Sequence, residues 1–173
     1  LGASTFEGCS SLATITLPSE IEELGDSLFK DCKSLSSITI PDSVTSIGMS
    51  TFENCSTLTQ IEIPDAVETL GMFAFQGCTA LQTATLGNGI TEVDYGTFLG
   101  DYALKSVTLP NNLETIGAFS FQGCTALKTL TIPQKVKKIA NGAFRDTAIK
   151  FTLSEGSLFE VKDEMLLSKD GKT

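Results

Sequence analysis

The side chains best suited to chemistry in this 173-residue chain are five cysteines with regular spacing. Cys9, Cys32, Cys55 and Cys78 lie 23 residues apart, and Cys124 follows 46 residues after Cys78. Their number is odd, and side chains in register along a repeat point the same way, which disfavours disulfides. We therefore interpret them as small buried residues whose thiols donate weak hydrogen bonds to backbone carbonyls. Bridged or reactive thiols are the alternatives.

Catalytic and metal-binding arrangements are hard to build from this composition. The chain has no histidine, which excludes Ser-His-Asp, Cys-His and H-E-x-x-H arrangements, and it has no C-x₂-C pair for zinc. Gly87-Asn88-Gly89 lacks the third glycine of a phosphate-binding loop, and the acids Glu22 and Glu23 fall where an exposed turn is expected. We therefore expect no catalytic residue, no cofactor and no metal site, and a protein that is not an enzyme.

The charge of the chain argues against nucleic acid as a partner. The net charge is −9, whereas nucleic-acid binding needs a basic face to displace counterions. Residues 1–101 hold two Lys or Arg and 14 Asp or Glu, whereas residues 102–173 hold ten and seven. This asymmetry either steers a charged partner or belongs to a solvated surface. No long apolar run is present, so we expect no membrane insertion within this piece of chain.

A strict 23-residue repeat positions all of these residues. Each repeat opens with L-x-x-apolar-x-apolar-P, and the opening leucines are Leu12, Leu35, Leu58, Leu81, Leu104 and Leu127. The two apolar positions alternate with polar neighbours, which is typical of a half-buried strand. Proline then ends the strand because it has no N–H to donate, although the fourth repeat has Gly87 instead.

The second part of the repeat is equally regular. Apolar residues at positions ten and thirteen predict a turn or a short second strand, and Gly25, Gly48, Gly71 and Gly117 follow, a common place for a backbone conformation that other residues resist. Position eighteen is phenylalanine in every repeat: Phe29, Phe52, Phe75, Phe98, Phe121 and Phe144. We expect the segment around each phenylalanine to make one or two helical turns.

A period without insertions predicts one coil of chain per repeat, each stacked on the next. The expected fold is a leucine-rich-repeat solenoid, a right-handed superhelix with a parallel β-sheet on one side and turns and short helical segments on the other. We assign residues 1–148 to the repeats: a partial coil at 1–11, then six repeats that begin at 12, 35, 58, 81, 104 and 127. Residues 149–173 are expected to form a C-terminal strand and a hairpin that cap the core. Residue 1 falls inside a repeat, so we expect an incomplete N-terminal end.

The repeat L-x-x-[IV]-x-[IL]-P-x-x-[IV]-x-x-[IL]-G-x-x-[AT]-F-x-[GND]-C closely resembles the BspA-like class of leucine-rich repeats over residues 2–148. The resemblance implies a surface or secreted protein of the kind found in anaerobic bacteria and mucosal protozoa. It also implies adhesion to host matrix proteins such as fibronectin and fibrinogen, and it brings no catalytic motif. The fourth repeat departs most from the pattern, with Asp94 in place of glycine and Asp101 in place of cysteine.

The candidate ligand-binding residues are the outward positions of the predicted strands. Positions three and five alternate with the apolar positions and should face solvent as a polar, threonine-rich surface. The twelve residues are Thr14, Thr16, Ser37, Thr39, Gln60, Glu62, Thr83, Thr85, Ser106, Thr108, Thr129 and Thr131. The alternative is that threonine simply suits exposed strands.

The sequence allows two interpretations for each of two further groups of residues. Apolar residues at positions fifteen and sixteen form either an exposed patch or part of the core: Met49, Met72, Phe73, Tyr95 and Phe119. A basic group either meets an acidic partner or is a solvated face: Lys128, Lys135, Lys137 and Lys138.

These patterns favour a non-catalytic protein-binding or adhesion domain at the cell surface or outside the cell. Its partner would be a protein ligand, such as an extracellular matrix or cell-surface protein, bound through the sheet face. The alternative is a structural spacer that projects another domain from the cell surface.

Overall fold

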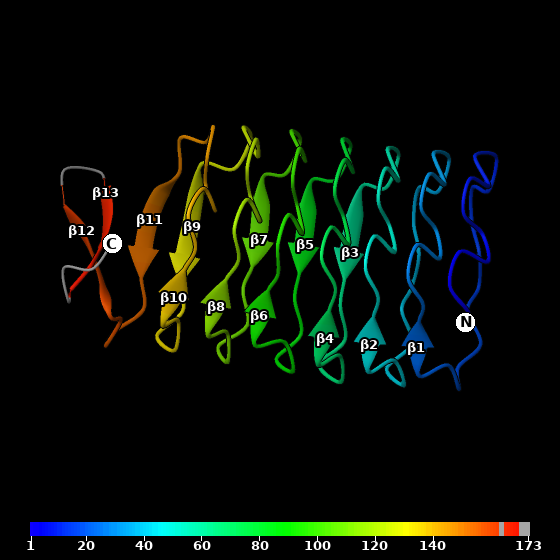
Figure 1. Ribbon diagram of the computed structural model, residues 1–173, viewed down its shortest axis with the longest axis horizontal. Coiled ribbons are helices and arrows are strands. Elements are labelled where there is room, and N and C mark those ends of the chain that lie inside the picture. The colour runs from blue at the N-terminus through cyan, green and yellow to red at the C-terminus, as the bar shows by residue number, and fades with distance from the viewer. Residues whose placement is uncertain (163–164, 170–173) are drawn as a thin grey trace.

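The computed structural model is a solenoid in which successive repeats form coils stacked along one axis, with the N-terminus at one end and the last strand, β13 (Met165–Ser168), at the other (Figure 1). The structure describes residues 1–162 and 165–169. Each coil contributes equivalent residues to the same place on the molecule, so the 23-residue period of the sequence becomes the spacing between coils.

One parallel sheet runs along the side formed by the opening of each repeat. It is divided into two hydrogen-bonded parts: β3 (Gln60–Glu62), β5 (Thr83–Thr85) and β7 (Ser106–Thr108) form a three-stranded sheet, and β9 (Thr129–Ile132) and β11 (Lys150–Leu153) form a two-stranded sheet. In β3, β5 and β7, each residue pairs with the residue 23 positions further along the chain, so Gln60 pairs with Thr83 and Thr83 with Ser106. The equivalent residues of the first two coils, 14–17 and 37–40, do not form strands. The predicted parallel sheet is confirmed, but it begins only at the third coil.

A second set of short parallel strands lies on the opposite side of each coil (Figure 1). It contains β1 (Glu23–Leu24), β2 (Ser46–Ile47), β4 (Thr69–Leu70), β6 (Glu92–Val93), β8 (Thr115–Ile116) and β10 (Lys138–Ile139). One residue of each strand points inward, and Leu24, Ile47, Val93 and Ile116 are fully buried. Of the two alternatives for this part of the repeat, the short second strand is present.

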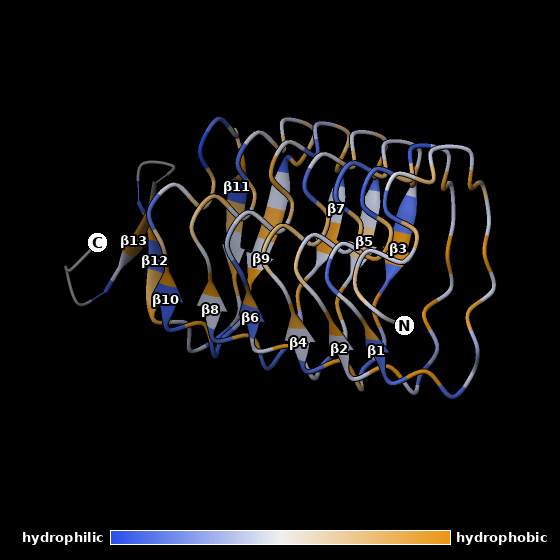
Figure 2. Ribbon diagram, turned by 45° about the vertical axis from the view of Figure 1, so that its right-hand side comes forward, coloured by the Kyte–Doolittle hydropathy of each residue, from blue (hydrophilic) through white to orange (hydrophobic). Residues whose placement is uncertain are grey.

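A column of stacked phenylalanines runs through the core along the axis of the solenoid. Ring centroids of neighbouring coils lie 5.3 to 5.6 Å apart from Phe6 to Phe144, and the ring planes differ by at most 17°. The five rings from Phe29 to Phe121 have no exposed surface. Apolar bands recur at the same place in successive coils (Figure 2), so the core is continuous along the axis.

The helical turns expected around each phenylalanine are absent from the described residues, and that prediction was wrong. In the first coil, Ser27, Phe29 and Asp31 donate their backbone N–H groups to carbonyls of the next coil at 2.8 Å, not to residues four positions back. Ser27 and Asp31 also have φ values of 54° and 59°, in the left-handed region. Two left-handed residues four positions apart interrupt any right-handed helix.

The glycines at position fourteen have a different role from the one the sequence indicated. Gly25, Gly48, Gly71 and Gly117 do not have positive φ angles. They are needed because the backbone of the preceding coil approaches too closely for a side chain. A Cβ atom on Gly71 would lie 2.5 Å from the backbone nitrogen of Met49. Close packing between coils, and not backbone flexibility, selects glycine here.

The C-terminal end carries the predicted strand and hairpin. β11 pairs in parallel with β9, and β12 (Phe159–Lys162) pairs antiparallel with β13 (Met165–Ser168). Phe159 is buried and Leu166 packs against the core, as a capping role requires. The link at residues 163–164 and most of the expected turn at residues 169–172 lie outside the described residues.

Candidate binding face

All twelve outward positions predicted from the repeat are exposed, and they lie on one face of the molecule. The eight from Gln60 to Thr131 are held by β3, β5, β7 and β9, and the four from Thr14 to Thr39 extend the face across the first two coils. Between them, the residues at position four turn inward, as Ile61 and Ala84 do. This alternation follows from the period of a strand, which places neighbouring side chains on opposite faces.

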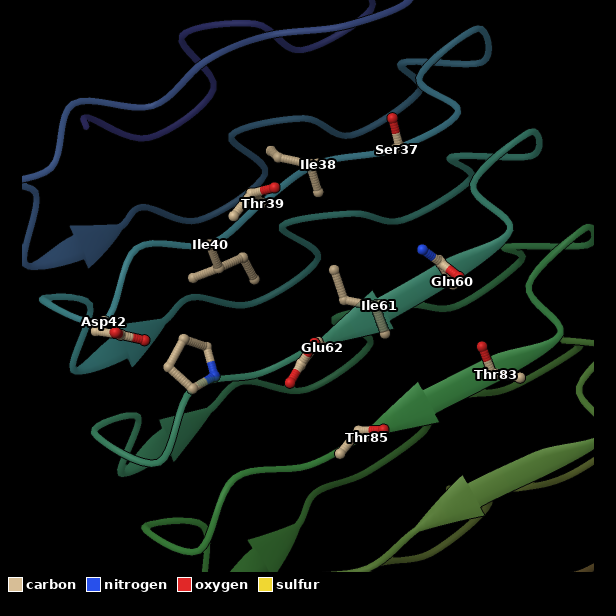
Figure 3. Close-up of a pocket in the computed structure, with 11 residues that line it drawn as sticks. Ser37, Ile38, Thr39, Ile40, Asp42, Gln60, Ile61, Glu62, Thr83 and Thr85 are labelled. Carbon is tan, nitrogen blue, oxygen red and sulfur yellow. The ribbon is translucent and has the colours of Figure 1, made fainter.

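The face has a depression beside β3, where the hydrogen-bonded strands end. A shallow depression of about 450 Å³ lies between residues 37–40 and β3, and it continues to Thr83 and Thr85. Figure 3 shows Ser37, Gln60 and Thr83 in one row and Thr39, Glu62 and Thr85 in a second row. No backbone hydrogen bond joins residues 37–40 to residues 60–62, all of which the structure describes. The backbone N–H and C=O groups at this edge of β3 therefore border the depression and form no hydrogen bond with residues 37–40 of the neighbouring coil.

Charge is distributed unevenly along this face. A second depression, of about 610 Å³, is bordered by Asp42, Glu62 and Asp65 in the acidic half of the chain. A third, of about 310 Å³, lies between β7 and β9 beside Lys105. In the described part of the chain, none of these three acids forms an ion pair. Any ligand that spans the face therefore meets an acidic end and a more basic end.

The cysteines belong to the core and not to this face. The thiols of Cys32, Cys55, Cys78 and Cys124 donate to carbonyls at 3.1 to 3.2 Å, which confirms the predicted weak hydrogen bonds. All five thiols are free, and only Cys9 is exposed. Burial raises the pKa of Cys32 to about 11, and it raises the pKa values of Cys55, Cys78 and Cys124 as well. Thiols that stay protonated are poor nucleophiles.

Asp101 stands in the cysteine column and is fully buried. Neither carboxyl oxygen has a hydrogen-bond partner. Burial raises the pKa of Asp101 well above its ordinary value; the nearby amides of Cys78 and Gly77 oppose this rise. Burial is the larger of these effects, so the pKa stays raised. Sequence comparison among the repeats identified the substitution of cysteine by aspartate, but it could not reveal a buried, unpaired acid.

The structure decides between the alternatives that the sequence left for the apolar group and for the basic group. Met49, Met72 and Tyr95 are exposed by 41%, 40% and 38%, and Phe73 and Phe119 are half-buried. The apolar residues at positions fifteen and sixteen therefore form an exposed patch. In the basic group, Lys137 pairs with Glu114 at 2.8 Å and Lys135 donates to Asn112 at 2.6 Å, as expected of a solvated face.

The described residues contain no cluster of three or more His, Cys, Asp or Glu that could hold a metal ion. In the part of the chain described, no helix is long and apolar enough to cross a membrane.

Comparison with known proteins agrees with this architecture. A sequence model of the BspA-type leucine-rich repeat region matches in six copies, over residues 1–100 and 45–168. The structure of a leucine-rich repeat protein from Eubacterium ventriosum is 27% identical with a TM-score of 0.67; the match covers 89% of this chain and 47% of that one. A leucine-rich repeat protein from T. pallidum is 26% identical with a TM-score of 0.57; that match covers 73% of this chain and 70% of the other. No curated protein sequence matches the chain.

Proposed function

This chain belongs to the BspA-type leucine-rich repeat family, and we propose that it is a non-catalytic binding domain of an adhesin at the cell surface or outside the cell. Its ligand would be a protein, such as a matrix or cell-surface protein of a host. The observation that carries the proposal is the continuous, exposed polar face formed by twelve equivalent positions on one side of the solenoid. Repeat proteins commonly bind on such an extended surface.

The face has the features that a protein ligand needs. Exposed threonine hydroxyls and the backbone edge of β3 offer hydrogen-bond donors and acceptors. The adjoining depressions give side chains of a partner somewhere to sit. The side chains on the face are mostly short, so their ordering on binding costs little conformational entropy.

Binding of the isolated domain to immobilised fibronectin, fibrinogen and a panel of cell-surface proteins and glycans tests the proposal. Thr85→Gln with Thr108→Gln places two bulkier uncharged side chains in the centre of the face. Thr69→Gln with Thr91→Gln is a matched control, because Thr69 and Thr91 are also exposed but lie with the second set of strands. We expect the first pair to weaken binding at least tenfold and the control pair to leave it unchanged.

The alternative is a spacer that projects another domain from the cell. The continuous phenylalanine column supports it, because stacked coils make a stiff rod. A spacer predicts that the folded domain binds nothing on the panel. It also predicts that adhesion by the full-length protein is unchanged by the Thr85→Gln and Thr108→Gln pair.

A further inference from the structure

A stripe of aromatic and methionine side chains crosses four coils at a corner of the solenoid, away from the sheet face. We call it the aromatic stripe, and it consists of Met49, Met72, Phe73, Tyr95 and Phe119. None of these residues lines any of the three depressions on the sheet face. The stripe is therefore a separate surface.

The rings of the stripe form an ordered ladder. Tyr95 contacts Phe73 edge-on at a centroid distance of 5.1 Å, and it contacts Phe119 in the same way at 5.4 Å. Edge-to-face pairs of this kind are favourable and fix the orientation of the rings. Three aromatic rings are thus held rigidly at a surface that water reaches.

The backbone is strained at two residues of the aromatic stripe. Phe73 and Phe119 have φ values of 59° and 57°, in the left-handed region that bulky residues avoid. The equivalent positions of other coils carry Ser27, Ser50 and Gly96, which tolerate this conformation better. Backbone strain kept at residues that are partly exposed to solvent is a mark of function.

The charge around the stripe indicates the partner. The three coils that carry Met49, Met72, Phe73 and Tyr95, residues 35–103, contain no Lys or Arg. Asp26 and Asp94 border the stripe, and each accepts a backbone N–H of a stripe residue: Met49 at 2.7 Å and Tyr95 at 2.6 Å. Within the described residues neither aspartate forms an ion pair. The aromatic stripe thus combines apolar side chains with neighbouring carboxylates and contains no Lys or Arg. Such a surface suits a ligand with both apolar and positively charged groups.

We propose that the aromatic stripe is a docking site for a basic, amphipathic peptide segment of a partner protein. Its apolar side chains would lie on the methionines and rings, where thioether groups adapt to different shapes. Its Lys or Arg groups would lie over the aromatic faces and beside Asp26 and Asp94.

Binding of a capped peptide, (Lys-Leu)₄, tests this site. Tyr95 and Tyr102 are the only tyrosines and the chain has no tryptophan, so a Tyr102→Phe background makes Tyr95 the sole fluorescent reporter. We expect (Lys-Leu)₄ to change Tyr95 fluorescence in a saturable way. Two control peptides, (Glu-Leu)₄ and (Lys-Ser)₄, should bind at least tenfold more weakly.

The matched variant replaces Phe73 and Phe119 with serine, the residue that Ser27 and Ser50 place in the same left-handed conformation. This variant keeps Tyr95 as the reporter and should remain folded. We expect it to bind (Lys-Leu)₄ at least tenfold more weakly. Met72→Ser, an exposed single change, should weaken binding about threefold in case the double variant unfolds. The sheet-face pair Thr85→Gln and Thr108→Gln should leave peptide binding unchanged.

Three results would overturn the proposal. The first is equal binding of (Lys-Ser)₄ and (Lys-Leu)₄, which would mean charge attraction alone. The second is unchanged affinity in the stripe variants. The third is concentration-dependent self-association in sedimentation that the stripe variants abolish, which would make the stripe a contact between copies of this chain. Failure of the sheet-face experiment would leave these results unaffected, because the two surfaces are probed by different variants.

Discussion

The ring of Phe73 lies against the backbone of Gly96, the equivalent residue of the next coil. A Cβ atom on Gly96 would lie 2.6 Å from Cδ1 of Phe73. Gly96 also has a φ of 61°, so it combines a left-handed backbone with a close ring above it. The same relationship recurs between Phe119 and Gly142. The rings of the aromatic stripe therefore depend on Gly96 and Gly142, each of which lies one coil further along than the ring it contacts.

Gly96→Ala should destabilise the protein by about 1–3 kcal/mol, because alanine adds left-handed strain and displaces the Phe73 ring. Gly100→Ala is the matched control, since Gly100 has a φ of 79° but no atom within 3.7 Å of an added Cβ. It should cost only about 1 kcal/mol. Urea denaturation measures both losses. Equal losses in the two variants, with unaltered Tyr95 fluorescence, would show that the Phe73 ring does not contact this position.

Phe75→Ala should lower the free energy of unfolding by about 3–5 kcal/mol. Phe75 is fully buried and stacks on both neighbours, Phe52 at 5.3 Å and Phe98 at 5.5 Å. Phe144→Ala is the control at the end of the column, where the ring is only half-buried, and it should cost clearly less. Chemical denaturation of both variants checks the order. A larger loss at Phe144 would mean that stability resides in the end of the solenoid.

The core of this protein could be predicted from the sequence because apolar residues recur at the same positions of every repeat, and the opening leucine and the phenylalanine recur unchanged. Phenylalanine in every coil could only form a column, and cysteine at a fixed interval could only form another. The face was predictable for the same reason, since strand alternation makes the polar positions exposed once the apolar ones are buried. Whether that face binds a ligand stays a prediction.

The turns were not predictable in the same way, because one backbone conformation is shared by unlike residues. Position sixteen is left-handed in Ser27, Phe73 and Gly96 alike, so no single residue type marked it. Position twenty gave a usable signal that the helical interpretation ignored. It alternates among aspartate, asparagine and glycine, as in Asp31 and Asn54, and these are the residues that favour the left-handed region. The strands missing from the first two coils had no sequence signal at all.

Asp101→Cys, which restores the repeated residue, should stabilise the protein, and the gain should grow with pH. The pKa of Asp101 is raised in the folded state, so the folded protein holds this proton more tightly than the unfolded chain. Its favourable contribution is complete below the pKa of an unfolded aspartate, about 3.9, and is lost as pH rises through the folded pKa. At pH 8 we expect a gain of about 1–3 kcal/mol, since an unpaired buried acid is removed.

Urea denaturation of the two proteins from pH 4 to pH 8 checks this dependence. The other acids are common to both proteins, so the difference between the two curves isolates Asp101. A difference that stays constant across this range would contradict the raised pKa.

One thiol per folded chain should react with a disulfide reagent such as DTNB at pH 8, and that thiol should be Cys9. Cys9 is exposed, whereas Cys32, Cys55, Cys78 and Cys124 are buried and donate to backbone carbonyls. Reaction requires the thiolate, and burial raises the pKa of Cys32 to about 11, so little thiolate forms at pH 8. Cys9→Ser should remove the rapid reaction, and five thiols should react in denaturant in the unchanged protein. Rapid reaction of a second thiol in the folded Cys9→Ser variant would show that the coils open locally at the cysteine column, with Cys32 the first to be exposed because it lies nearest the N-terminal coil.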